Sequence, residues 1–139
     1  MAYTLKIGER APDFNLLGTD DAFHDLSSYR KHEILIISFT CNHCPYVIGS
    51  DEITRQTVEK YNRESLKLVC INSNSKNTYQ EDSFENMQAR MKEHKFPWDY
   101  LHDESQEIAT NYGALKTPHF FIFDSDRSLI YTGRGIDNP

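Results

Sequence analysis

The sequence predicts an α/β fold, in which helices flank a central mixed β-sheet. The apolar, β-branched segments 34–39 and 66–71 have the composition of strands that are buried on both faces. Polar stretches with scattered apolar positions follow each of them, as expected for helices that connect neighbouring strands. Two further β-rich runs, 120–123 and 129–132, flank a turn and indicate an antiparallel hairpin.

The first half of the chain predicts a short strand, a turn and the first buried strand, in that order. Residues 11–18 alternate apolar and polar side chains and end in turn residues, which favours a short strand. Residues 24–29 suit a turn or a single helical turn before the strand at 34–39. We expect the helix that follows to run to about Tyr61.

A capped helix is predicted after the second buried strand and its polar loop, 72–78. Asp82 and Glu85 have the spacing of a capping box for a helix that runs to about His94. The residues at 96–98, which include a proline, then interrupt the helical pattern.

A second capped helix is predicted before the hairpin. Asp103 and Gln106 form another capping box, and Gly113 is placed to end this helix. In the resulting sheet, the residues after segment 34–39 lie at the carboxyl end of a central strand. Open α/β sheets place their active sites at that end.

Cys41 and Cys44 form a Cys-x-x-Cys motif between a predicted strand and a predicted helix. The first cysteine meets unpaired N–H groups and the positive end of the helix dipole, which favour a thiolate. Pro45 suits the first helical turn, and His43 can add positive charge between the two sulfurs. Thiols in such motifs have a pKa between roughly 3.5 and 7.5. The pattern therefore predicts a redox-active dithiol.

A structural zinc site and a pair of inert cysteines are the alternatives at this motif. Tetrahedral zinc needs four ligands, usually as two pairs at similar spacing. The only other cysteine is Cys70, and the six histidines form no pair at ligand spacing, so we expect no metal there. Cys70 is expected to act as a small apolar side chain in a buried strand.

Size and composition predict one soluble domain over residues 1–139. The net charge of −6 argues against a nucleic-acid partner. No stretch approaches the ~18 apolar residues of a membrane span, and the start of the chain has no signal-peptide pattern. Three cysteines do not suit a disulfide-stapled secreted fold. We expect a cytoplasmic protein, and an exported form with its signal removed stays open.

Four segments resemble the thioredoxin superfamily, in its peroxiredoxin-like, thiol–disulfide oxidoreductase branch of the redoxin type. They are residues 8–14 (Gly-x-x-Ala-Pro-Asp-Phe), residues 39–47 around the dithiol, residues 103–114, and Thr117-Pro118 with the β run after it. Together they span nearly the whole chain, and the resemblance implies a thioredoxin-like fold.

The resemblance also implies roles for particular residues. Cys41 would be the nucleophile, and Cys44 would resolve the mixed disulfide. Thr117-Pro118 would be a cis peptide in a loop where a substrate chain pairs by β-augmentation. The implied substrates are protein or small-molecule thiols and disulfides, with no cofactor and with a reducing partner such as thioredoxin or glutathione.

The chain departs from its relatives at two places. Lys116 stands where many relatives carry a further cysteine, which excludes a third redox cysteine there. The sequence given ends at Pro139, where relatives continue into a closing helix, so either the sequence is truncated there or this protein lacks the helix. In both cases we expect a fold of residues 1–139 without that C-terminal helix. One face of the hairpin would then be under-covered, which predicts either a homo-oligomer formed through it or another segment folded over it.

Two other functions stay open. In a peroxiredoxin-like thiol peroxidase, Ser38 would supply the hydroxyl near the peroxide and Arg134 a guanidinium, although Ile34 replaces the expected proline. In a carrier of a soft metal such as Cu(I), Cys41 and Cys44 would bind the ion together with a histidine, either His43 or His119.

Overall fold

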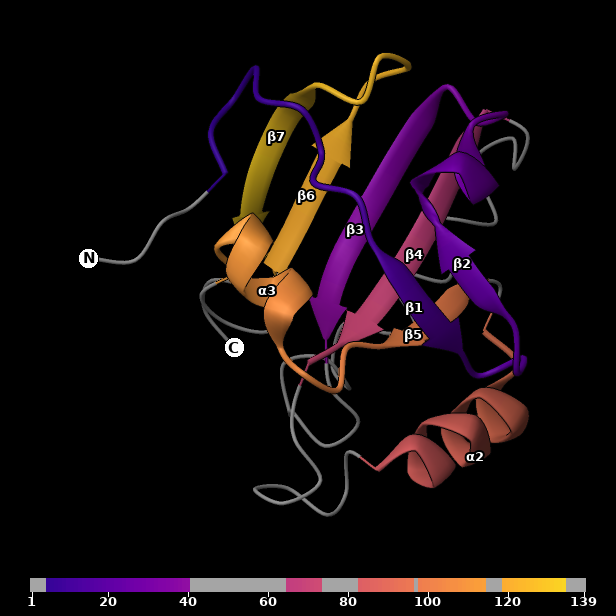
Figure 1. The fold of residues 1–139 in the computed structure, drawn as a ribbon. Helices are drawn as coiled ribbons and strands as arrows, with labels where there is room; N and C mark the ends of the chain where they lie inside the picture. Colours follow the sequence, from indigo (N-terminus) through magenta and orange to yellow (C-terminus); the bar gives the residue numbers. More distant parts are fainter. Residues whose placement is uncertain (1–4, 41–64, 74–82, 97, 115–118, 135–139) are drawn as a thin grey trace.

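The computed structural model describes residues 5–40, 65–73, 83–96, 98–114 and 119–134. Seven strands form one sheet in the order β2-β1-β5-β4-β3-β6-β7 (Figure 1). The strands are β1 (Asn15–Gly18), β2 (Phe23–Asp25), β3 (Ile34–Thr40), β4 (Leu66–Asn72), β5 (Asp99–His102), β6 (His119–Phe123) and β7 (Leu129–Arg134). The predicted mixed sheet is confirmed.

Three parallel strands form the middle of the sheet. β3 pairs with β4 over seven residues, from Ile34 opposite Leu66 to Thr40 opposite Asn72, and β5 continues the parallel ladder beside β4. The remaining strands pair antiparallel at both sides of this group. The carboxyl ends of β3, β4 and β5 therefore meet at one edge of the sheet, here called the carboxyl edge.

The hairpin and both buried strands were predicted correctly, whereas β2 and β5 were not expected. β2 has three residues and β5 has four, and β5 begins and ends with charged or polar side chains. Segments this short show little periodicity in hydrophobicity, so the sequence alone does not mark them as strands. They form strands because β2 pairs with β1 and β5 pairs with β4. The predicted turn at 24–29 is the 3-10 helix η1 (Leu26–Tyr29), preceded by β2.

Helix α2 (Phe84–His94) ends at the predicted residue, but its predicted cap is wrong. The N-cap is Ser83, whose hydroxyl accepts a hydrogen bond from the Asn86 N–H at 3.2 Å. Asp82 lies outside the described residues. Ser and Asp cap helices by the same hydrogen bond, so a run with both can begin at either residue.

Helix α3 (Glu107–Tyr112) is also capped differently from the prediction. Its N-cap, Gln106, has a φ of 65° and makes no side-chain hydrogen bond to the cap, so the predicted capping box is absent. Asp103 still serves the helix start, since its carboxylate accepts from the Ala109 N–H at 2.9 Å. Gly113 ends the helix with a φ of 68°, as predicted.

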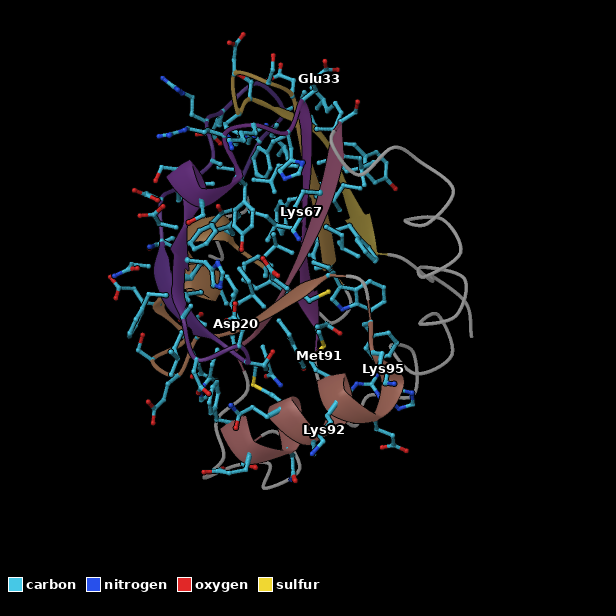
Figure 2. All side chains as sticks on the ribbon, turned by 90° about the vertical axis from the view of Figure 1, so that its right-hand side faces the viewer. Asp20, Glu33, Lys67, Met91, Lys92 and Lys95 are labelled. Carbon is cyan, nitrogen blue, oxygen red and sulfur yellow. The ribbon has the colours of Figure 1, made fainter. Side chains whose placement is uncertain are left out.

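Two apolar clusters lie on the two faces of the sheet, and a helix belongs to each. Met87 of α2 is fully buried on one face. Ile108 and Tyr112 of α3 are buried on the other. Figure 2, in which Glu33 marks the end of the sheet where β3 begins, shows α2 with Lys92 and Lys95 near the other end. No helix in the described part of the chain is long and apolar enough to cross a membrane.

The outer strand β7 carries exposed apolar side chains. Ile130 is 49% exposed and Tyr131 is 52% exposed, while Phe120 and Ile122 of the neighbouring strand are half-buried. Residues 135–139 lie outside the described residues, so the structure does not test the expectation about a closing helix. The homo-oligomer expected through this hairpin stays a prediction.

Arg127 fastens the hairpin turn to η1 at the edge opposite the carboxyl edge. Its guanidinium donates to the carbonyl oxygens of Tyr29 at 2.8 Å, His32 at 2.7 Å and Asp124 at 2.8 Å. Partial burial lowers the pKa of this guanidinium, while the charge of Asp124 opposes that shift. One side chain therefore joins segments that lie almost a hundred residues apart in the sequence.

Replacing Arg127 with alanine should lower the free energy of unfolding by about 2 to 3 kcal/mol, because three carbonyl groups lose a charged donor. Urea unfolding followed by circular dichroism would measure the change. Arg30→Ala is the control, since Arg30 is exposed and its loss should cost less than about 0.5 kcal/mol. Equal effects of the two substitutions would contradict the role of Arg127.

Candidate functional site

The predicted site residues lie outside the described residues, but the strands next to them are described. Cys41, His43 and Cys44 come directly after Thr40, the last residue of β3. Thr117 and Pro118 come directly before β6. The first residue of β6, His119, pairs with Phe39 in β3, so both segments join the sheet at the carboxyl edge.

This edge holds the buried polar residues of the described part of the chain. Five polar or charged side chains are buried there: Ser38, Thr40, Asn72, Asp103 and His119. Four of them end, begin or directly follow a strand at the carboxyl edge, and Ser38 lies two residues before the end of β3. Burying polar groups costs free energy unless they are hydrogen-bonded, so their concentration at one edge points to a role beyond packing.

Asn72 lies in the middle of this edge. It is fully buried, it pairs with Thr40 on one side and with His102 on the other, and its amide donates to the Tyr100 hydroxyl at 3.1 Å. The neighbouring His102 stacks on Phe84 at the start of α2, with ring centroids 5.7 Å apart. These contacts fix the end of β4 between β3 and β5.

Asp103 follows β5 and is 1% exposed. One carboxylate oxygen accepts from the Ser73 hydroxyl at 2.6 Å and from the Ala109 N–H at 2.9 Å. The other oxygen accepts from the Ile108 N–H at 3.3 Å. The backbone N–H of Asp103 donates to the Asn72 carbonyl at 2.9 Å. Asp103 thus ties the end of β4 to the first turn of α3.

His119 is the buried polar residue on the β6 side. Its Nε2 lies 3.0 Å from the Thr132 hydroxyl, and its ring stacks on Phe121 with centroids 4.4 Å apart. Sequence reasoning named His119 only as a metal partner. Within the described residues, no cluster of three or more His, Cys, Asp or Glu side chains could hold a metal ion. The dithiol itself lies outside them, so a metal carrier is not tested.

Ser38, whose hydroxyl the peroxidase alternative would use, lies within β3. It pairs with Cys70 on one side and Phe120 on the other, within β3, and it is 3% exposed. Ile34, at the position expected for proline, begins the same strand. The side chain of Arg134 is not described. Because Cys41 also lies outside the described residues, the structure does not test the peroxidase alternative.

Sequence reasoning did not assign Asn72, Ser73 or Thr132 to the site, and it treated Asp103 only as a helix cap. A usable signal was present, because polar residues end the otherwise apolar strand β4 and follow β5. Which of them share an edge depends on strand order, and strand order was not fixed without β5.

Cys70 is a buried apolar residue, as predicted. It is 6% exposed and packs with Leu68, Met87 and Trp98 on the face covered by α2. Burial raises the pKa of its thiol far above the usual range, and the charge of Asp99 adds to the shift. The nucleophilic thiolate is therefore scarce at neutral pH.

A variant in which Cys70 is the only thiol, Cys41→Ser/Cys44→Ser, should not react with a chromogenic disulfide reagent while folded at pH 8. The same variant should release one equivalent of chromophore in denaturant, because unfolding exposes the sulfur and returns its pKa to the usual range. One rapidly formed equivalent from the folded protein would contradict the assignment of Cys70 as a packing residue.

Two solved structures of unassigned function are similar to nearly the whole chain. A hypothetical protein of Sinorhizobium meliloti shares 32% identity at a TM-score of 0.92, covering 99% of this chain and 75% of that one. An uncharacterized conserved protein of Geobacillus kaustophilus shares 36% identity at a TM-score of 0.92, covering 99% and 73%. None of the curated proteins compared with the chain matches it.

A more distant structure supports the fold alone. The thioredoxin domain of a thiol-disulfide oxidoreductase from Bacteroides vulgatus superposes with a TM-score of 0.79 at 14% identity, covering 95% of this chain and 91% of that one. A sequence model of the Redoxin family matches residues 6–139. The chain therefore belongs to the Redoxin family and has a thioredoxin-like fold.

Proposed function

We propose that the protein is a thiol–disulfide oxidoreductase whose redox centre is the dithiol of Cys41 and Cys44. The observation that carries this proposal is the position of the Cys-x-x-Cys motif, directly after β3 at the carboxyl edge of a Redoxin-family sheet. The concentration of buried polar residues at the same edge supports it. An edge that only closes a hydrophobic core would not need them.

The reaction is two successive thiol–disulfide exchanges. The Cys41 thiolate attacks one sulfur of a substrate disulfide, that S–S bond breaks, and the released substrate thiolate takes up a proton. The Cys44 thiol then loses its proton and attacks the Cys41 sulfur of the mixed disulfide, which releases the second substrate thiol. Two electrons pass to the substrate, and the Cys41–Cys44 disulfide is reduced again by thioredoxin, glutathione or a similar thiol.

Thr117 and Pro118 are proposed to form the substrate loop, and His43 to lower the pKa of the attacking thiol. The first role is supported by the pairing of His119 with Phe39, which joins the start of β6 to the end of β3. An extended substrate chain bound at that place would gain main-chain hydrogen bonds by β-augmentation. The second role follows from the place of His43 between the two cysteines.

Cys41 should be alkylated first when the reduced protein meets limiting iodoacetamide near neutral pH, because it would be the thiolate at the helix start. Peptide mass spectrometry would locate the adduct. Cys41→Ser should abolish disulfide reduction, Cys44→Ser should accumulate the mixed disulfide, and Cys70→Ser is the control that keeps full activity. Preferential labelling of Cys44 or Cys70 would overturn the assignment, and Cys41-dependent peroxide consumption in place of disulfide exchange would support a peroxidase.

His43→Ala should make the dithiol less oxidising, because the imidazole stabilises the thiolate of the reduced form. Each pKa unit lost corresponds to about 1.4 kcal/mol, or ~30 mV for a two-electron couple. Equilibration with glutathione buffers would measure the potential. A wild-type value near about −270 mV indicates a reductant, and one near about −120 mV an oxidant. An unchanged or more oxidising variant would show that His43 does not act on the sulfurs.

A further inference from the structure

His24 of β2 lies between two carboxylates that belong to different elements. Its Nε2 lies 2.9 and 3.1 Å from the two carboxylate oxygens of Asp20, in the turn between β1 and β2. On the other side of the ring, Nδ1 lies 4.0 Å from Oδ2 of Asp99, the first residue of β5. We propose that His24 is a proton-dependent latch. It holds strands β1 and β2 with their turn, here called the β1–β2 unit, on β5 while the imidazole is charged, and it loosens them when the imidazole is neutral.

The charged ring suits this position and the neutral ring does not. The imidazolium has an N–H on both nitrogens, so it can donate to Asp20 and attract Asp99 at the same time. The neutral ring has one N–H, and its other nitrogen presents a lone pair to a carboxylate. Loss of the proton therefore turns one of the two contacts from attractive to repulsive. Asp20 is 55% exposed, so the solvent reaches this pair and can exchange protons with it.

The other groups around the ring come from η1, β4 and the next residue of the chain. The Tyr29 hydroxyl donates to Asp99 at 2.9 Å, and the Tyr29 ring stacks on His24. Burial and the charge of Asp99 raise the pKa of Tyr29 far above its usual range, so this donor is retained. Lys67 lies 3.7 Å from Asp99 and shares this carboxylate with His24, which limits the strength of the latch. The carboxylate of Asp25 is occupied as the cap of η1.

The attachment of the β1–β2 unit to β5 is short, so one added contact matters. The ladder between β1 and β5 has two residue pairs, and the Thr19 N–H extends it with a hydrogen bond to the Tyr100 carbonyl at 2.9 Å. From α2, the amide of Gln88 donates to the Thr19 carbonyl at 3.1 Å and to the Asp21 carboxylate at 3.2 Å. This second anchor does not involve His24. Opening of the latch should therefore loosen the unit locally and leave the fold intact.

Gly18 lets the imidazole and the carboxylate pack directly on the junction between β1 and β5. A Cβ atom at this residue would lie 2.6 Å from Oδ1 of Asp20 and 3.0 Å from Cδ2 of His24. β5 continues from the junction to His102, which pairs with Asn72 at the carboxyl edge. The charge of His24 thus acts on a strand that also supports that edge.

Hydrogen exchange of the Thr19 amide measures the latch, because this N–H joins the β1–β2 unit to β5. NMR would follow exchange in the full chain at about pH 5.5 and about pH 7.5, on either side of the usual range for histidine. Each rate is expressed as a protection factor relative to the intrinsic rate at that pH. Protection should be present while the ring is charged and fall about threefold to fivefold as the pH rises, the effect of one partly exposed ion pair. The midpoint of the fall should coincide with the pH at which the His24 ring titrates in the same spectra.

Three variants and one internal reference separate the latch from general destabilisation. His24→Gln should abolish the pH dependence of Thr19 protection, because glutamine cannot gain a proton. Asp20→Asn should reduce it, because the amide keeps an acceptor and loses the charge. His32→Gln is the matched control, which removes an imidazole from the segment between η1 and β3 and should leave the fall unchanged. The Leu129 amide of β7, on the other side of the sheet, should show no such fall in the wild-type protein.

Equal wild-type protection of Thr19 at the two pH values, an undiminished fall in His24→Gln, or the same fall at Leu129 would each overturn the proposal. If His24→Gln does not fold, Asp20→Asn decides, since Asp20 is exposed and its replacement leaves the ring in place. The latch does not depend on the proposed redox chemistry, and Cys41→Ser/Cys44→Ser should show the same pH dependence. Failure of the latch and failure of the proposed function are therefore separate results.

Discussion

The parallel pairing of β3 with β4 is the constraint on which the rest of this structure depends. Seven consecutive residues of each strand face one another, and most of their side chains are buried. A shift by one residue would turn Leu35, Ile37 and Phe39 to the opposite face and separate them from α3. The same register brings Thr40 and Asn72 to the edge together, so the core and the site are set by one interaction.

The two ends of this sheet use polar groups in different ways. At the edge opposite the site, Arg127 and Asp124 make their hydrogen bonds within or next to the hairpin turn, partly in contact with solvent. At the carboxyl edge, Asn72, Asp103 and His119 are each less than 10% exposed. Burial there costs more and leaves less freedom to move, because every donor and acceptor must find a partner inside the protein. Thiol–disulfide exchange requires that the reacting sulfurs and the bound substrate be held in a fixed relative position. Buried, hydrogen-bonded polar groups at one edge of the sheet are suited to that requirement.

Sequence patterns were sufficient for the parts of the fold with strong local signals. Segments 34–39 and 66–71 and the hairpin are long, apolar or alternating, and each strand lies within two residues of its predicted bounds. β5 was missed because its four residues form a strand only between β1 and β4, which is a tertiary effect. The caps of α2 and α3 were misplaced because Ser83 and the positive φ of Gln106 offer alternatives that spacing alone does not distinguish. The sequence shows that these polar residues end or follow the strands, but only the strand order shows that they lie together at the carboxyl edge.

The buried polar residues of the carboxyl edge and the proposed redox residues belong to different parts of the chain. The described polar residues belong to β3, β4, β5 and β6 or directly follow them, whereas the dithiol and the Thr-Pro pair lie outside the described residues, between β3 and β4 and between α3 and β6 in the sequence. Connections tolerate substitution better than the strands they join. Lys116 also lies among these intervening residues, directly before the Thr-Pro pair. Under the proposed function, we therefore expect substitutions in these intervening residues to change which disulfide or thiol is recognised, while the strands that carry the buried polar groups keep the fold.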